Sequence, residues 1–232
     1  MLIILLNGLG ICFGTLFGYF FKNYSSERVS KAIICVMGLQ IIVMGIKDAM
    51  QYENGLENII YLVVGMTMGE ILNIDGKLNS LGEFLQKRIK AKGENKDNNM
   101  VKGFVTATLI FSVGSMAILG PLKIALENNS ELLSVKIVLD TVMSAILASA
   151  YGMGVIFSAV VVVVYQGAVY LLADFLARIT NPTVINQISS IGGVLLLALG
   201  LSLLFEEKNI KVTNMLPAMF LPVFVEIIKN LI

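Results

Sequence analysis

The chain contains no histidine, and only two cysteines and 14% charged residues occur among its 232 positions. Without histidine it lacks the commonest general base, proton shuttle and metal ligand of proteins. Cys12 and Cys35 lie in apolar stretches, which favours two small hydrophobes over a disulfide or a thiol site. We therefore expect no metal site and no cofactor.

The scarcity of charge also excludes an ordinary water-soluble domain, because soluble chains carry about 25% charged residues. Apolar residues make up 56% of the chain, and its mean hydropathy is +0.83. At about 20 apolar residues per crossing, the chain has room for about seven or eight membrane-spanning helices and for no soluble catalytic domain.

Two further absences narrow the function. No GxSxG or HExxH pattern and no acid pair at i,i+4 occurs in the apolar segments, so we expect no enzyme. The net charge is only +1 and no basic cluster is interleaved with aromatics, so nucleic acid is not an expected partner.

The apolar runs predict an all-α polytopic membrane helix bundle with eight crossings, and seven is the alternative. The chain starts at MLIILLNGLG with no basic segment or cleavage site, so we expect the first helix to be retained. The fourth crossing meets Gly120-Pro121 and the eighth contains Pro217 and Pro222, so both are candidates for broken helices. The expected spans cover residues 2–21, 30–50, 58–73, 103–126, 134–150, 153–177, 184–205 and 212–231.

One long hydrophilic stretch, residues 74–102, separates the two apolar blocks. Apolar residues recur within it at helical spacing, which predicts an amphipathic helix on the membrane surface, followed by a polar GENKDNN loop. These residues are Leu78, Leu81, Phe84, Leu85 and Ile89. Docking of a partner is the alternative use of the same face.

Lysine and arginine are distributed unevenly over the loops. With the N-terminus outside, twelve of the 17 fall on the side that carries residues 74–102, and the other five, which include Lys136, fall on the opposite side. The positive-inside rule therefore predicts a cytoplasmic 74–102 loop, with both termini outside.

A glycine spacing of seven residues occurs in both the second and the seventh expected helix. The two pairs are Gly38 with Gly45 and Gly193 with Gly200. In the same register, Glu70 and Glu226 lie near the far end of the helix that follows each pair. Five helix steps separate the second helix from the seventh, so the two units run in opposite directions, which is typical of an inverted-topology repeat. Chance matches among 21 glycines are the alternative.

In the repeat interpretation, residues 1–232 form a single integral membrane domain. Residues 1–73 are the first three-helix repeat and residues 151–232 the second. The 74–102 segment and an inserted broken-helix hairpin, residues 103–150, lie between them.

Charged and amide side chains inside hydrocarbon are costly unless they face a partner or a water-filled path, so each is a functional candidate. Asp140 has the strongest local support, because Ser144 and Tyr151 share its helical face. The alternative for this face is a set of hydrogen bonds between helices. The alternative for Glu70 is an ion pair with a nearby Lys at the membrane interface. The path candidates are Asn7, Gln40, Glu70, Asp140, Ser144, Tyr151, Gln166, Asn214 and Glu226.

The segment FSVGSMAILGP, residues 111–121, is the least helix-like apolar run. A break there would direct helix dipoles into the protein, as at the ion sites of transporters, and a kinked continuous helix is the alternative. A second flexible junction follows Tyr151. The hinge candidates are Gly114, Ser115, Gly120, Pro121, Gly152 and Gly154.

A GxxxGxxxG ridge, made by Gly10, Gly14 and Gly18, runs along the first helix. Small residues at this spacing let another helix approach closely. The ridge is either an internal packing surface or the seam of a homo-oligomer.

These motifs carry a family resemblance. NGLGICFGTLFG at the start, FSVGSMAILGP, KIVLDTVMSAILASAYGMGVIFSA at 136–159, YQG at 165–167 and NMLPAMFLP at 214–222 resemble the bacterial membrane family catalogued as domain of unknown function 554. The resemblance covers nearly the whole chain except the 87–102 loop. It implies a multi-pass protein of the bacterial cytoplasmic (inner) membrane and supplies no substrate or catalytic residue.

Together these features predict a small secondary transporter or channel-like permease for a small solute or monovalent ion. The chain has no nucleotide-binding loop, so any coupling would be to an ion gradient. A non-transporting membrane scaffold or regulatory subunit, which would use the basic 77–102 segment, is the alternative.

Overall fold

The computed structural model describes residues 1–22, 27–89, 98–113, 115–179, 181–205 and 210–231, and within them it contains helices and no strands. The all-α prediction is therefore confirmed. The helices are α1 (Leu2–Lys22), α2 (Glu27–Ala49), α3 (Gly55–Leu72), α4 (Ile74–Ile89), α5 (Asn98–Ser112), α6 (Ser115–Glu127), α7 (Glu131–Tyr151), the 3-10 helix η1 (Met153–Phe157), α8 (Ser158–Leu171), α9 (Ala173–Ile179), α10 (Pro182–Leu204), the 3-10 helix η2 (Val212–Phe220) and α11 (Leu221–Leu231).

The bundle is apolar on its outside. On α1, for example, Leu9, Phe13 and Phe17 are more than half exposed, while Asn7 and Thr15 are fully buried. A water-soluble protein would show the reverse arrangement, because water rather than hydrocarbon would surround it. Seven described helices or helix pairs are long and apolar enough to cross a membrane, and an eighth candidate is the bent pair α5–α6.

The glycine ridge of α1 packs against α7 inside the molecule. A methyl group on Gly18 would lie 1.9 Å from the backbone oxygen of Ala145. One on Gly14 would lie 2.1 Å from that of Thr141. Only glycine permits this approach of two backbones. The ridge is covered by α7, as in the internal-packing alternative, and a homo-oligomer seam at Gly10, Gly14 and Gly18 would require α7 to move away.

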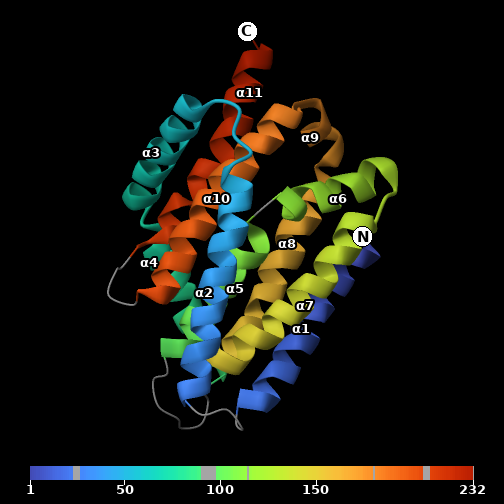
Figure 1. The fold of residues 1–232 in the computed structure, drawn as a ribbon. Coiled ribbons are helices and arrows are strands. Elements are labelled where there is room, and N and C mark those ends of the chain that lie inside the picture. Colours follow the sequence, from blue (N-terminus) through green and yellow to red (C-terminus); the bar gives the residue numbers. More distant parts are fainter. Residues whose placement is uncertain (23–26, 90–97, 114, 180, 206–209, 232) are drawn as a thin grey trace.

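The same contacts show that α1 and α7 run in parallel, as Figure 1 shows at the side of the bundle that holds the N-terminus. Gly10 faces Ile137 and Gly18 faces Ala145, so residue numbers increase in the same direction along both helices. Two parallel spanning helices must have an odd number of crossings between them. Since α2 and α3 supply two, α5 and α6 together must act as the third.

The fourth span is therefore a broken helix. α5 and α6 meet at an angle of 52°, and in Figure 1 α6 lies across the bundle while α5 runs along it. Pro121 is inside α6, six residues after its start, so the break does not fall at the proline. A break within residues 111–121 was one of two expectations, beside a kinked continuous helix, and the described helices end at Ser112 and begin at Ser115.

The eighth span combines η2 and α11. A 3-10 helix rises about 2.0 Å per residue and an α-helix about 1.5 Å, so these 20 residues reach about 34 Å, enough for a hydrocarbon core of about 30 Å. Pro217 lies inside η2. Long 3-10 segments are uncommon and often mark a hinge.

The two predicted glycine pairs face each other where α2 and α10 cross in the middle of the bundle (Figure 1). A methyl group on Gly45 would lie 2.8 Å from the backbone oxygen of Gly193. One on Gly200 would lie 2.8 Å from the backbone oxygen of Gly38. The pairing is antiparallel and joins the first glycine of one pair to the second of the other.

The amphipathic segment forms α4, which packs on α5 and η2. Leu81 and Phe84 are exposed on it, as expected of a helix at a membrane surface. The predicted GENKDNN loop falls mostly on residues 90–97, which lie outside the described part of the chain, and its last two residues, Asn98 and Asn99, begin α5.

Candidate functional site

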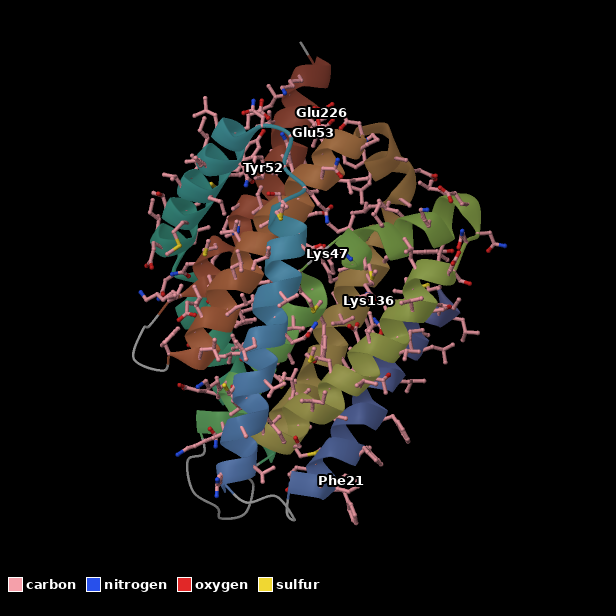
Figure 2. The ribbon with its side chains drawn as sticks, in the orientation of Figure 1. Phe21, Lys47, Tyr52, Glu53, Lys136 and Glu226 are labelled. Atoms are coloured by element: carbon pink, nitrogen blue, oxygen red, sulfur yellow. The ribbon has the colours of Figure 1, made fainter. Side chains whose placement is uncertain are left out.

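An ion pair lies buried in the membrane-spanning part of α7. The Lys136 ammonium donates to the carboxylate of Asp140, and Nζ lies 2.9 Å from each of the two carboxylate oxygens. Both side chains are only 7% exposed. Figure 2 shows Lys136 at mid-height of the bundle, well away from Glu53 and Glu226 at its end. Their i,i+4 spacing places the two groups on the same face of the helix.

Two amide side chains from other helices complete this cluster. Asn7 of α1 donates its Nδ2 to Asp140 Oδ2 at 3.1 Å and to Gln166 Oε1 of α8 at 3.2 Å. Asn7 and Gln166 are fully buried. The membrane-core cluster therefore consists of Asn7, Lys136, Asp140 and Gln166, which come from three helices.

The glycines of α1 bring Asn7 within reach of the other cluster residues. Gly10 and Gly14 bring α1 against Thr141 of α7, and Gly8 brings α1 against Val163 of α8. Asn7 is next to Gly8, at the point where α1 contacts both helices. Its short side chain can therefore reach the carboxylate and the Gln166 amide at the same time.

The cluster retains unused hydrogen-bonding capacity. Asn7 Oδ1 and Gln166 Nε2 are buried and have no hydrogen-bond partner among the described residues. A buried polar atom without a partner costs about 1–3 kcal/mol. The cluster thus combines a neutralised ion pair with one uncommitted acceptor and one uncommitted donor, which suits interaction with a polar solute, an ion or a proton.

Lys136 was not among the predicted site residues. It was expected among the loop cations, and this was wrong, because Lys136 is buried inside α7 beside Asp140. The signal was its i,i+4 spacing from Asp140. Removing it from the loop count leaves four basic residues on the less basic side against twelve on the other, so the charge asymmetry becomes stronger.

Ser144 and Tyr151 share the face of Asp140 but do not join the cluster. Ser144 is fully buried, and its hydroxyl donates to the backbone oxygen of Thr141 on its own helix at 2.8 Å. Tyr151 is buried at the opposite end of α7, where the Lys102 ammonium lies 5.9 Å from the centre of its ring. The predicted polar face is therefore divided between the cluster and helix contacts.

Glu70 and Gln40 are placed on the surface. Glu70 is exposed and accepts a hydrogen bond from Lys211 at 3.3 Å, which corresponds to the alternative of an interfacial pair with a lysine. Gln40 is exposed on α2. Neither has a hydrogen bond to the membrane-core cluster.

Asn214 and Glu226 lie in two other contacts. Asn214 is fully buried and its Oδ1 accepts from the backbone N–H of Asp75 at 2.7 Å, which ties η2 to α4. Glu226 is half-buried and its Oε1 accepts from Asn181 at 2.8 Å, which ties α11 to the start of α10. The path candidates thus fall into a core cluster and several contacts near the ends of the helices.

The hinge candidates have different surroundings. Gly152 ends α7 with a φ of 83°, a left-handed conformation that glycine adopts without strain. A methyl group on Gly154 would lie 1.9 Å from the backbone oxygen of Met100, so η1 packs directly on the start of α5. Gly120 contacts Leu133, Pro121 is buried in α6, Ser115 begins α6, and Gly114 lies outside the described residues.

The comparisons with known proteins agree with this membrane architecture. The model of the family described as "Protein of unknown function (DUF554)" matches residues 3–227. The chain is 31% identical to the "Uncharacterized membrane protein YdfK" of Bacillus subtilis (strain 168), over 93% of this chain and 91% of the relative. It is 23% identical to the "Uncharacterized protein YqgA" of Escherichia coli (strain K12), over 93% of this chain and 92% of the relative. No solved structure matches.

Proposed function

We propose, from the premise that this chain belongs to the DUF554 family, that it is a small permease whose path passes the membrane-core cluster of Asn7, Lys136, Asp140 and Gln166. The observation that carries the proposal is the burial of an ion pair with uncommitted amide atoms in an apolar bundle. Ionisable groups inside a membrane are costly and are typical of solute, ion and proton pathways.

Stability alone does not account for such a pair. Replacing a buried ion pair by well-packed apolar residues is often neutral or stabilising, because the desolvation of both charges is then avoided. A bundle selected only for packing would keep leucine and methionine at these positions. A transported cation or proton can replace the Lys136 ammonium at Asp140, so the ion pair would serve as a binding site on the transport path.

The antiparallel pairing of helices supports a two-unit permease. The matched glycines of α2 and α10 contact one another in the exchanged manner that a twofold-related pair requires. The helices that follow them, α3 and η2–α11, also pack together antiparallel, because Gly65 faces Ala218 and Gly69 faces Asn214. Inverted repeats of this kind build many secondary transporters.

The broken fourth span adds a further element. On the two sides of the break, Phe111 at the end of α5 and Ala117 near the start of α6 are buried, whereas Met116 is exposed. Broken helices in membranes occur where backbone groups are buried in protein or line a path. Coupling would be to an ion gradient or absent.

The test is solute flux in proteoliposomes loaded with amino acids, organic acids or monovalent ions. Wild type is compared with the double variant Lys136→Met/Asp140→Leu, which removes both charges together and is expected to fold. The proposal expects flux in wild type and at least about a tenfold loss in the variant, the effect of about 1.4 kcal/mol on the barrier. Absence of flux for every solute, or equal flux in the two proteins, would contradict it.

The alternative is a membrane scaffold, and the exposed Leu81 and Phe84 on α4 are the observation that favours it. Replacing residues 90–97 with a Gly-Ser linker of the same length removes three lysines and keeps α4 and α5, which end and begin at Ile89 and Asn98, connected. A permease should keep its flux after this replacement, whereas a scaffold that uses the basic segment should lose its partner.

We also propose that the protein resides in the bacterial inner membrane with the 74–102 segment in the cytoplasm. The support is the strengthened charge asymmetry of the loops. Labelling a cysteine introduced at exposed Lys77 in intact and in opened cells tests this, with Cys12 and Cys35 replaced by alanine. The proposal expects labelling only in opened cells. Labelling in intact cells would show that the 74–102 segment faces the outside.

A further inference from the structure

A cavity of about 450 Å³ opens at the end of the bundle where α4 and the last turns of α10 meet. It lies between α4, α5, α10 and η2, away from the membrane-core cluster, none of whose residues line it. Its volume is in the range of small-molecule sites, about 300–1,000 Å³. A single water needs only about 30 Å³, so the cavity is large enough for an organic solute.

Two uncommitted charges of opposite sign line this cavity, and they come from different helices. Glu83 of α4 makes no hydrogen bond or ion pair with any described residue. Lys102 of α5 makes none either, and its ammonium lies 5.9 Å from the centre of the Tyr151 ring. The two groups are thus too far apart to pair with each other, and neither is neutralised by the protein described.

The third charge at the cavity is already engaged. Asp75 accepts a hydrogen bond from the hydroxyl of Thr213 on one oxygen and from Asn79 Nδ2 on the other, at 3.0 Å. Its backbone N–H donates to Asn214. These bonds hold α4 against η2, so Asp75 acts in the wall of the cavity and leaves one acid and one base available.

A buried hydroxyl is also available to a ligand. Thr106 is 3% exposed and lines the cavity, and its hydroxyl has no hydrogen-bond partner among the described residues. Ser202 of α10 offers a second hydroxyl without such a partner. Apolar side chains complete the lining between these polar groups, namely Val105, Leu109 and Leu199.

We propose that this cavity binds a small zwitterion, with its ammonium on Glu83, its carboxylate on Lys102 and its carbon chain along the apolar lining. A singly charged cation would leave Lys102 without a counter-charge, and a singly charged anion would leave Glu83 without one, whereas a molecule with both charges engages both side chains. Thr106 donates a hydrogen bond to the carboxylate. This inference rests on the proposed permease function, because the zwitterion would be the class of solute that the permease carries.

Equilibrium binding to the full-length protein in lipid nanodiscs tests the inference without any transport step. The probes are radiolabelled β-alanine and γ-aminobutyrate, with propylamine and butyrate as competitors that carry one charge each. The proposal expects that at least one zwitterion binds and that neither competitor displaces it at equal concentration. No binding of either probe, or equal displacement by a singly charged competitor, would overturn it.

Single substitutions test which side chain binds each charged end of the ligand. Glu83→Gln and Lys102→Met should each weaken binding by about tenfold or more, because each removes a charge-assisted hydrogen bond. Thr106→Val should weaken it by about fivefold, because it removes one hydrogen bond to the carboxylate from a neutral donor and leaves the ion pair with Lys102 in place. Asp174→Asn and Lys77→Gln change exposed charges that do not line the cavity and should leave binding unchanged.

The outcomes separate this inference from the proposed function. Selective binding without flux of any solute would retain the cavity site and reject the permease. Flux of other solutes without zwitterion binding would retain the permease and reject the site. Wild-type affinity in both Glu83→Gln and Lys102→Met would reject the site even if a zwitterion binds elsewhere.

Discussion

Two acid–lysine pairs in this protein have the same chemistry and opposite surroundings. Lys136 and Asp140 lie 2.9 Å apart with side chains that are each 7% exposed. Lys211 and Glu70 lie 3.3 Å apart with side chains that are 45% and 44% exposed. The first pair is held inside the bundle by Asn7, and the second lies where polar surroundings can solvate both charges.

The difference teaches that an acid in an apolar segment is not by itself evidence for a path. Asp140 and Glu70 both lie inside predicted membrane spans, and both were candidates on that ground. Exposed ion pairs contribute little, whereas a buried charge must be compensated. Variants of the two pairs should therefore differ greatly, and the following experiments rank the expected effects.

The largest effect is expected for Asp140→Asn. This variant leaves the Lys136 ammonium buried without a counter-charge, so the free energy of unfolding should fall by about 3–5 kcal/mol. The loss of helical circular dichroism during titration of mixed micelles with sodium dodecyl sulfate measures it. An unfolding midpoint equal to that of wild type would show that the ammonium is solvated, and the contrast between the pairs would disappear.

The next effect is expected for Gly18→Ala. Its methyl group would lie 1.9 Å from the backbone oxygen of Ala145, so α1 and α7 must separate. Overpacking of this kind costs about 1–3 kcal/mol in unfolding free energy, read from the same titration. Gly167→Ala is the matched control, because no atom outside its chain neighbours and its own helix backbone lies within 4 Å of the added methyl group. Similar losses in both would argue against a tight α1–α7 contact.

A smaller effect is expected for Asn7→Ala. It removes two hydrogen bonds, to Asp140 and to Gln166, worth about 1 kcal/mol each. In the Lys136→Met/Asp140→Leu background, only the bond to Gln166 is left to lose, so the cost should be about half. Equal costs in the two backgrounds, measured as a double-mutant cycle, would mean that Asn7 does not interact with Asp140.

The smallest effect is expected for Glu70→Gln. The carboxylate and its lysine are both exposed, so the unfolding midpoint should not change measurably. High salt should likewise leave wild type and variant indistinguishable. A loss as large as that of Asp140→Asn would indicate that Glu70 is buried in the bilayer-embedded protein.

The sequence determined a large part of the architecture. Long apolar runs separated by short polar segments can bury their backbone hydrogen bonds in hydrocarbon only as helices, so the helical class and most span boundaries follow from composition and length. FSVGSMAILGP also indicated the broken span, because glycine, serine and proline in close succession weaken a helix. Among the candidate residues, Asn7, Asp140 and Gln166 were identified by polarity alone.

Only the tertiary structure decided which of these residues meet. Asn7 and Gln166 are 159 positions apart, and no local pattern relates them. Their contact depends on which face of α1 packs on α7 and α8, which the glycine ridge permits but does not specify. The structure also showed that Lys136 belongs with Asp140 and that Glu70 does not. Burial is a property of the assembled bundle, and burial determines whether the same charge is compensated in the core or solvated at the surface.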